Sequence, residues 1–283
     1  MPETALRRRD LIAEGAAALR AGGLPAPRRE AFGIWREVSR EPLDIGPEGQ
    51  DAVDSAVTVA FRRAIARRAA GEPLAYVTGW SGFRHLTLWC DPRALIPRPE
   101  TEGLVDLLLT RTRQGRVADL GTGTGCLALS LAREGGFSDV VGVDLSAAAL
   151  SLAAENMART GKQVRLLRGD LCECLAGGSL DALVSNPPYL TRAEFGRLDP
   201  SVRDWEPVQA LVGGTDGMEV TTRILEGARR VVRPGGWVAL EVDCHRASAC
   251  AARAGALGWT EVVIQVDLFG RERYLLARRS DTQ

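Results

Sequence analysis

The sequence is poor in the residue types that build metal sites, disulfide frameworks and strongly basic surfaces. Its 283 residues include only two histidines, His85 and His245, and a single lysine, Lys162. None of its six cysteines forms a Cys-x-x-Cys pair, so we expect no metal site and interpret most cysteines as small core residues. The 36 basic and 36 acidic residues balance, which argues against a protein that binds nucleic acid through overall charge.

Long apolar runs are absent as well. No long apolar stretch follows residues 1–9, so no signal peptide is expected, and no run approaches the length of a membrane span. We therefore expect a soluble, cytoplasmic protein with no membrane partner. The length predicts one large domain with an appendage, or two domains, and the 45% apolar content is enough for a sizeable core.

The first 70 residues show helical periodicity. Apolar side chains recur at helical spacing in three stripes, and Gly22-Gly23 is typical of the end of a helix. We interpret the stripes as the core of a helical domain over residues 1–72. Their members are Leu6, Leu11, Ile12 and Leu19, then Phe32, Trp35 and Val38, then Val53, Val57, Phe61, Ala64 and Ile65.

A linker follows over residues 73–93. Glycines punctuate residues 71–82, and Phe83, Leu86, Leu88 and Trp89 come next, a pattern that predicts a β-hairpin. The prolines of the segment 95–102 then predict a stiff loop that starts a helix near Thr101.

Strands and helices alternate through the remaining residues, 94–283. Strands are expected at 117–120, 140–143, 164–168, 181–185, 237–242, 260–265 and 273–277. Alternation predicts a parallel, doubly wound α/β sheet, and the last two strands predict an antiparallel hairpin at its end. Seven strands with this ending match the class I methyltransferase architecture.

A glycine-rich turn follows the first of these strands. It comprises Gly121, Thr122, Gly123, Thr124 and Gly125, and a helical apolar face begins directly after it. Such a turn lets the backbone approach a ligand closely. Asp144 ends the next strand, 19 residues after Gly125, where an acidic residue accepts hydrogen bonds from ribose hydroxyls.

The spacing of this turn distinguishes two cofactor classes. A dinucleotide dehydrogenase is a fair first interpretation, but its Gly-x-Gly-x-x-Gly spacing differs from the Asp-x-Gly-x-Gly-x-Gly present here. Asp119 would also repel a pyrophosphate, whereas a sulfonium and an amine tolerate a carboxylate. We therefore predict S-adenosyl-L-methionine as the cofactor. Asp170 is a candidate for the adenine ring, with a helix N-cap as the alternative of equal weight.

The sequence Asn186-Pro187-Pro188-Tyr189 follows the predicted strand 181–185. Each proline fixes its own φ, so the carbonyls of Asn186 and Pro187 have nearly fixed directions. Two acceptors beside an aromatic ring suit a planar group that carries an NH2. We expect the Asn186 side-chain oxygen and the Pro187 carbonyl to hold that group, and Tyr189 to pack against it.

Several motifs together resemble the peptide chain release factor glutamine methyltransferases, the HemK-like family. The resemblance runs from about Gly71 to the C-terminus. The segments that carry it are residues 71–76, 95–102, 119–125, 185–189, 205–211, 217–218 and 267–271. It implies methylation of the glutamine side-chain amide in the Gly-Gly-Gln motif of class 1 release factors.

The same resemblance implies site residues. Cofactor contacts would come from Gly121 to Gly125, Asp144, Asp170, Leu171 and Asn186, and substrate contacts from Asn186, Pro187, Pro188 and Tyr189. The helical N-terminal domain would help to hold the release factor. Leu171 stands where the family often has an aromatic residue, and Asp243 stands where it usually has glycine.

One alternative uses the same pocket. An enzyme that methylates the exocyclic amine of adenine or guanine also needs two acceptors beside an aromatic ring. Such an enzyme needs a target-recognition domain or a basic surface to flip the base, and the sequence after Tyr189 supplies neither. We therefore expect no direct nucleic-acid binding. A second alternative, a cofactor-binding module without catalysis, is disfavoured because Asn186 to Tyr189 are intact.

Overall fold

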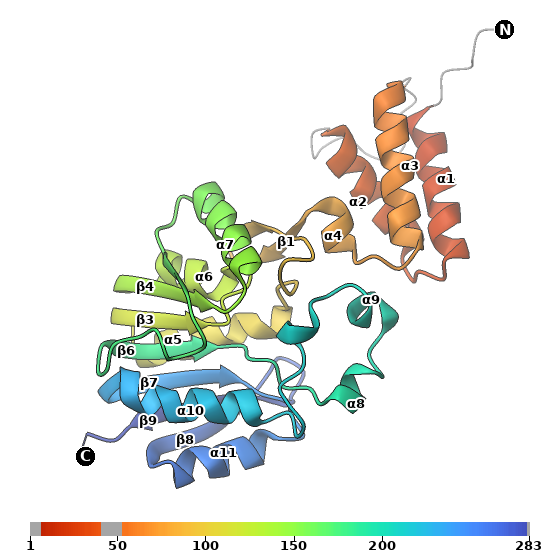
Figure 1. Cartoon of the computed structure of the whole chain (residues 1–283). Helices are drawn as coiled ribbons and strands as arrows, with labels where there is room; N and C mark the ends of the chain where they lie inside the picture. The colour runs from red at the N-terminus through yellow and green to blue at the C-terminus, as the bar shows by residue number, and fades with distance from the viewer. Residues whose placement is uncertain (1–6, 41–52, 282–283) are drawn as a thin grey trace, which may run out of the picture. The chain divides into compact units, whose positions relative to one another are not determined.

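The computed structural model describes residues 7–40 and 53–281, which form two compact units (Figure 1). One unit contains the described residues up to Gly79 together with Asp199–Trp205, and the other contains the remaining described residues. None of the described helices is both long and apolar enough to cross a membrane. The domain limits expected from the sequence remain predictions.

The first unit is helical. It contains α1 (Arg8–Ala21), α2 (Pro27–Ser39), α3 (Ser55–Ala69), the short α4 (Leu74–Thr78) and α9 (Pro200–Arg203). Pro27 starts α2, and the Asp54 side chain caps α3 by accepting a hydrogen bond from the Ala56 N–H.

The three predicted apolar stripes form the core of this unit. The Trp35 and Phe61 rings meet edge-on at 5.5 Å between centroids. Leu11, Ile12, Leu19, Ala64 and Ile65 are also buried in this core, and Phe32, Val38, Val53 and Val57 pack against it partly buried. Leu6, the first member of the predicted stripes, lies outside the described residues.

The predicted β-hairpin is present, but it is shorter than expected. Strands β1 (Trp80–Phe83) and β2 (Leu86–Trp89) pair antiparallel. Residues 74–78, which the sequence placed in the hairpin linker, instead form α4. Pro73 sets the backbone before the helix, and Gly79, with φ of 83°, ends it in the left-handed conformation that favours glycine.

The second unit contains a seven-stranded sheet that confirms the predicted fold class. The strand order is β5-β4-β3-β6-β7-β9-β8, with β3 to β7 parallel and β8 and β9 antiparallel at the end. The strands are β3 (Gln114–Leu120), β4 (Gly136–Asp144), β5 (Arg165–Arg168), β6 (Leu180–Ser185), β7 (Val232–Glu241), β8 (Trp259–Val266) and β9 (Glu272–Arg279).

Helices cover both faces of this sheet because successive strand residues point to opposite sides. On β3, Val117 packs into one apolar cluster with α5 and α6, whereas Ala118 and Leu120 pack into another with α10 and α11. The helical segments of this unit are η1 (Pro99–Thr101), α5 (Glu102–Arg111), α6 (Cys126–Glu134), α7 (Ala147–Thr160), α8 (Arg192–Phe195), η2 (Val208–Ala210), α10 (Glu219–Val231) and α11 (Ala247–Ala256).

The strand order reverses direction between β3 and β6. From β3 the chain continues to β4 on one side, and β6 later pairs with β3 on the other side. Connections therefore diverge at the carboxyl ends of these two strands, which is where open α/β sheets bind ligands. The glycine-rich turn follows β3, and Asn186 follows β6, so both predicted motifs meet at this point.

Candidate active site

A cavity of about 240 Å³ lies at the carboxyl edge of the sheet. The loops after β3, β4, β5 and β6 and the segment before α5 contribute to its walls. Gly125, Pro187 and Tyr189 are predicted site residues that are not among the lining residues. The predicted residues that do line the cavity are Gly121, Thr122, Gly123, Thr124, Asp144, Asp170, Leu171, Asn186 and Pro188.

The glycine-rich turn adopts backbone conformations that would be strained for residues with a side chain. Gly121, Gly123 and Gly125 have φ values of 67°, 54° and 82°, all in the left-handed region. The turn is held to the sheet because the Thr122 N–H donates to the Val143 carbonyl at 3.0 Å. The backbone can therefore form one wall of the cavity with no side chain between it and a ligand.

Asp119 lies beneath this turn and is 1% exposed. Its Oδ2 accepts hydrogen bonds from the Thr122 hydroxyl at 2.7 Å and the Ala128 N–H at 3.2 Å. Its Oδ1 is buried and has no hydrogen-bond partner within the described part of the chain. Burial raises the pKa of Asp119 to about 7, although both donors oppose this shift. A buried acceptor on a cavity wall suits a cationic or hydrogen-bond-donating part of a ligand.

Asp144 ends β4, the position predicted for a residue that binds the ribose hydroxyls. Its carboxylate accepts hydrogen bonds from the Gly123 N–H at 2.9 Å and the Ser146 N–H at 2.8 Å. Burial raises the pKa of Asp144, and these backbone donors oppose the shift. Because each carboxylate oxygen can accept a second hydrogen bond, the fixed carboxylate keeps acceptor capacity toward the cavity.

Asp170 and Leu171 line the cavity at the end of β5. The Asp170 carboxylate pairs with Arg223 at 2.8 Å, and no helix begins at Asp170, so the helix N-cap interpretation is wrong. Leu171 has φ of 50°, an uncommon conformation for a residue with a side chain. Asp170, neutralised by Arg223, and the apolar Leu171 therefore lie on the same wall of the cavity.

Asn186 is tied into a chain of hydrogen bonds. Its side-chain nitrogen donates to the Thr101 hydroxyl at 2.9 Å, and Thr101 donates to Glu241 Oε2 at 2.7 Å. The Tyr189 hydroxyl donates to the other oxygen of Glu241 at 3.3 Å. Thus one buried carboxylate joins the first and last residues of the Asn-Pro-Pro-Tyr motif. The Tyr189 phenol is directed to Glu241 rather than to the cavity lining.

The segment before α5 is fixed by a buried acid. Glu206, 4% exposed, accepts a hydrogen bond from the Ile96 N–H at 3.1 Å and from Arg98 at 2.5 Å. A charge-assisted pair of this kind holds the proline-containing loop against the cavity. Two of the segments that carry the family resemblance, residues 95–102 and 205–211, are therefore in direct contact.

Sequence reasoning missed three contributors to this site. Thr101 was interpreted only as a helix start, and neither Glu241 nor Arg223 was assigned a role. The signal for Glu241 was available, because an acid that ends a buried strand lies at the edge where ligands bind. No local pattern indicated that Thr101 and Glu241 meet across 140 residues.

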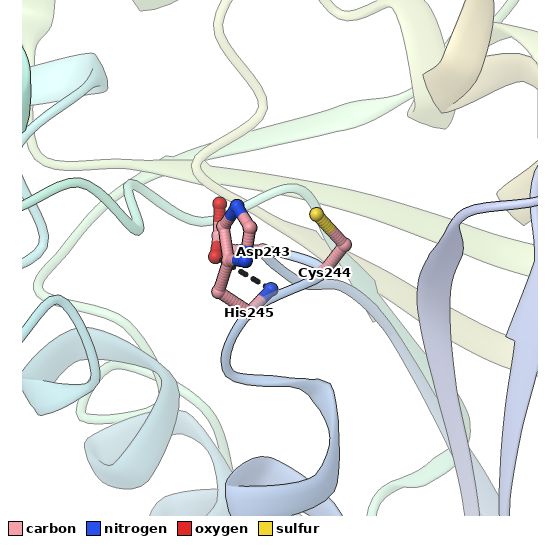
Figure 2. Close-up of side chains that lie close together, drawn as sticks. All are labelled: Asp243, Cys244 and His245. Atoms are coloured by element: carbon pink, nitrogen blue, oxygen red, sulfur yellow. Dashed lines mark hydrogen bonds between the residues drawn. The ribbon is translucent and has the colours of Figure 1, made fainter.

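Figure 2 shows Asp243, Cys244 and His245, which follow β7. Their candidate ligand atoms all lie within 4.8 Å of one another. The Asp243 carboxylate already accepts the His245 N–H at 2.9 Å and pairs with Arg246 at 3.2 Å. A guanidinium beside the carboxylate opposes a metal cation, so we assign no metal to this group.

Two family models match the chain. The methyltransferase small domain matches residues 99–197, and the PrmC N-terminal domain matches residues 10–79. A solved structure, a methyltransferase from Pyrococcus furiosus, is similar to 69% of this chain over 90% of its own length. The TM-score is 0.53 and the sequence identity 22%, which supports the fold alone.

Curated relatives extend the likeness over nearly the whole chain. The release factor glutamine methyltransferase of Deinococcus radiodurans is 40% identical over 96% of this chain and 98% of its own. The protein of the same name from Nitratidesulfovibrio vulgaris is 38% identical over 93% of this chain and 92% of its own. With this identity, both matching domain models and the predicted sheet, the chain belongs to the release factor glutamine methyltransferase family.

Proposed function

We propose that this protein transfers a methyl group from S-adenosyl-L-methionine to the glutamine side-chain nitrogen in the Gly-Gly-Gln motif of class 1 release factors. The observation that carries the proposal is the fixed amide of Asn186 on the cavity wall. The names of the curated relatives support glutamine as the residue and a release factor as the protein substrate.

The cavity residues fit S-adenosyl-L-methionine. Asp119 offers its unpartnered Oδ1 to the positively charged methionine end of the cofactor. Asp144 has remaining acceptor capacity for the ribose hydroxyls, and Leu171 offers an apolar surface for adenine, with Asp170 beside it. Gly121 to Thr124 supply a backbone wall. When bound, the cofactor supplies an electrophilic methyl carbon attached to a sulfonium.

Asn186 and Pro187 would hold the substrate amide. With its nitrogen committed to Thr101, Asn186 has its side-chain oxygen left to accept one N–H of a carboxamide. The Pro187 carbonyl would accept the other. An amide nitrogen is a poor nucleophile because its lone pair is delocalised, and two acceptors on its hydrogens favour the pyramidal geometry needed for attack. They also stabilise the positive charge that develops on the nitrogen.

Tyr189 and Pro188 would complete the substrate subsite by fixing the plane of the amide. No strong general base is needed, because the positively charged product nitrogen loses its proton readily to water. Positioning therefore accounts for most of the proposed rate enhancement. We further propose that the helical N-terminal domain helps to hold the release factor, that the protein works in the cytoplasm, and that it does not bind nucleic acid directly.

A labelling experiment tests this function. The protein is incubated with methyl-labelled cofactor and, in separate reactions, a purified class 1 release factor, duplex DNA or ribosomal RNA. We expect label on the release factor only, and none when its Gly-Gly-Gln glutamine is replaced. Asn186→Ala is the matched control for background transfer. Label on nucleic acid alone would support the exocyclic amine alternative and contradict the proposal.

A further inference from the structure

We propose that Thr101 and Glu241 are positioning residues that set the orientation of the Asn186 amide, so that its oxygen faces the substrate nitrogen. This inference rests on the proposed function and adds two residues to the machinery, neither of which touches the reacting atoms. Both side chains are 2% exposed. Both belong to elements far from Asn186 in the sequence, η1 and β7.

The direction of each hydrogen bond follows from the chemistry of its members. An ionised carboxylate only accepts, so the Thr101 hydroxyl must donate its hydrogen to Glu241. The Thr101 oxygen then offers only lone pairs to Asn186 and requires the NH2 side of that amide. The Asn186 oxygen is therefore turned away from Thr101 and is free for a ligand. If the Asn186 amide were reversed, its NH2 group would face the N–H groups of the substrate amide, and neither side would offer an acceptor.

The same carboxylate fixes Tyr189 through its second oxygen. The charged and titratable groups that act on Glu241 come from several elements. Arg273 on β9 favours its ionised form, whereas Glu100 before α5 opposes it. Tyr189 and Tyr274 also lie near enough for Glu241 to raise their pKa values, and Asp243 acts on Tyr189 as well.

Protonation of Glu241 would remove the directional control. Burial raises the pKa of Glu241, while Thr101, Arg273 and Tyr189 oppose this shift. A neutral carboxyl can donate to Thr101, whose hydroxyl can then donate to the Asn186 oxygen. That reversal withdraws the acceptor that the substrate amide needs. Turnover should therefore fall with decreasing pH as Glu241 takes up a proton.

Matched substitutions test this chain of hydrogen bonds. Thr101→Val keeps the side-chain shape but removes the hydroxyl, and we expect kcat to fall about 10-fold or more. Thr101→Ser keeps the hydroxyl and should restore most of the lost turnover. Thr110→Val is the control, because it removes an exposed hydroxyl from α5, the helix that begins directly after Thr101. Cofactor affinity, measured by calorimetry, should change less than kcat in Thr101→Val.

Glu241→Gln supplies the pH test. We expect the acid limb of its kcat profile to flatten relative to the wild-type protein, because the group that titrates is gone. A merely structural role would lower the melting temperature without changing the shape of that profile. An unchanged acid limb, or equal kcat in Thr101→Val and Thr101→Ser, would overturn the proposal.

A measurement without substrate separates this inference from the proposed function. The side-chain NH2 signals of Asn186, identified by their loss in Asn186→Asp, are followed by nitrogen-15 NMR. We expect them to shift in Thr101→Val and Glu241→Gln and to stay near their wild-type positions in Thr101→Ser. Signals that do not move would overturn the positioning role whatever the acceptor is. Failure to label a release factor, with these shifts present, would overturn only the proposed function.

Discussion

The buried carboxylate of Asp119 makes cofactor affinity dependent on pH. In the free protein the pKa of Asp119 is raised to about 7 by burial. If its unpartnered oxygen receives the positive end of S-adenosyl-L-methionine, the complex requires the ionised form. The protein must then release a proton on binding below pH 7, so affinity falls as the pH decreases.

The size of the effect follows from the fraction ionised. About half of Asp119 is ionised at pH 7 and about one eleventh at pH 6, so affinity should fall about fivefold over this interval. The cofactor amine, with an ordinary pKa of about 7.7–8.0, stays largely protonated throughout. Further acidification should weaken binding by up to about tenfold per pH unit.

Calorimetric titration of the cofactor at both pH values checks this expectation. Asp119→Asn is the matched control, because an amide keeps an acceptor for Thr122 and Ala128 but cannot ionise. Its affinity should be lower at pH 7 by about 10-fold or more and nearly independent of pH. Equal pH dependence in the two proteins would refute the role of Asp119, since another group would then be titrating.

Three further substitutions have defined outcomes. Asn186→Ala should reduce kcat by about 10–150-fold, from the loss of about 1.5–3 kcal/mol, with a smaller change in the cofactor Kd; near-normal turnover would show that the nitrogen is held elsewhere. Glu206→Ala should lower the free energy of unfolding by about 1–3 kcal/mol, measured in urea, because Arg98 loses its partner. Since Arg98 is partly exposed, a larger loss of stability would indicate a wider rearrangement. Gly125→Ala should cost about 1–2 kcal/mol, because φ is 82° and the new Cβ would lie 3.2 Å from a Leu129 methyl group; thermal unfolding unchanged from the wild-type protein would contradict this.

The sheet could be predicted because its strands are buried and short. Residues 117–120 and 181–185 are nearly continuous apolar runs, which is typical of parallel strands covered on both faces. Their neighbours Gly121 and Asn186 were then placed at one edge by topology alone. The structure extended several strands, such as β7, which begins at Val232 rather than residue 237, because strand boundaries depend on pairing partners.

The remaining features depend on contacts that no local pattern contains. Residues 74–78 form a helix in place of the expected part of the hairpin, because Pro73 precedes its first residue and Gly79 ends it. Asp170 is paired with Arg223 from α10, a contact across 53 residues. Such side chains meet only after the sheet has formed, so their roles followed from the structure.

The most direct test of the account is to locate the transferred methyl group. A purified class 1 release factor is incubated with the protein and cofactor carrying a deuterated methyl group, and its peptides are sequenced by mass spectrometry. We predict a single label on the glutamine of the Gly-Gly-Gln motif, on the side-chain nitrogen, and its absence with Asn186→Ala. A label on another residue, or on the Gly-Gly-Gln glutamine to the same extent with Asn186→Ala, would contradict the claim that Asn186 holds the reacting amide.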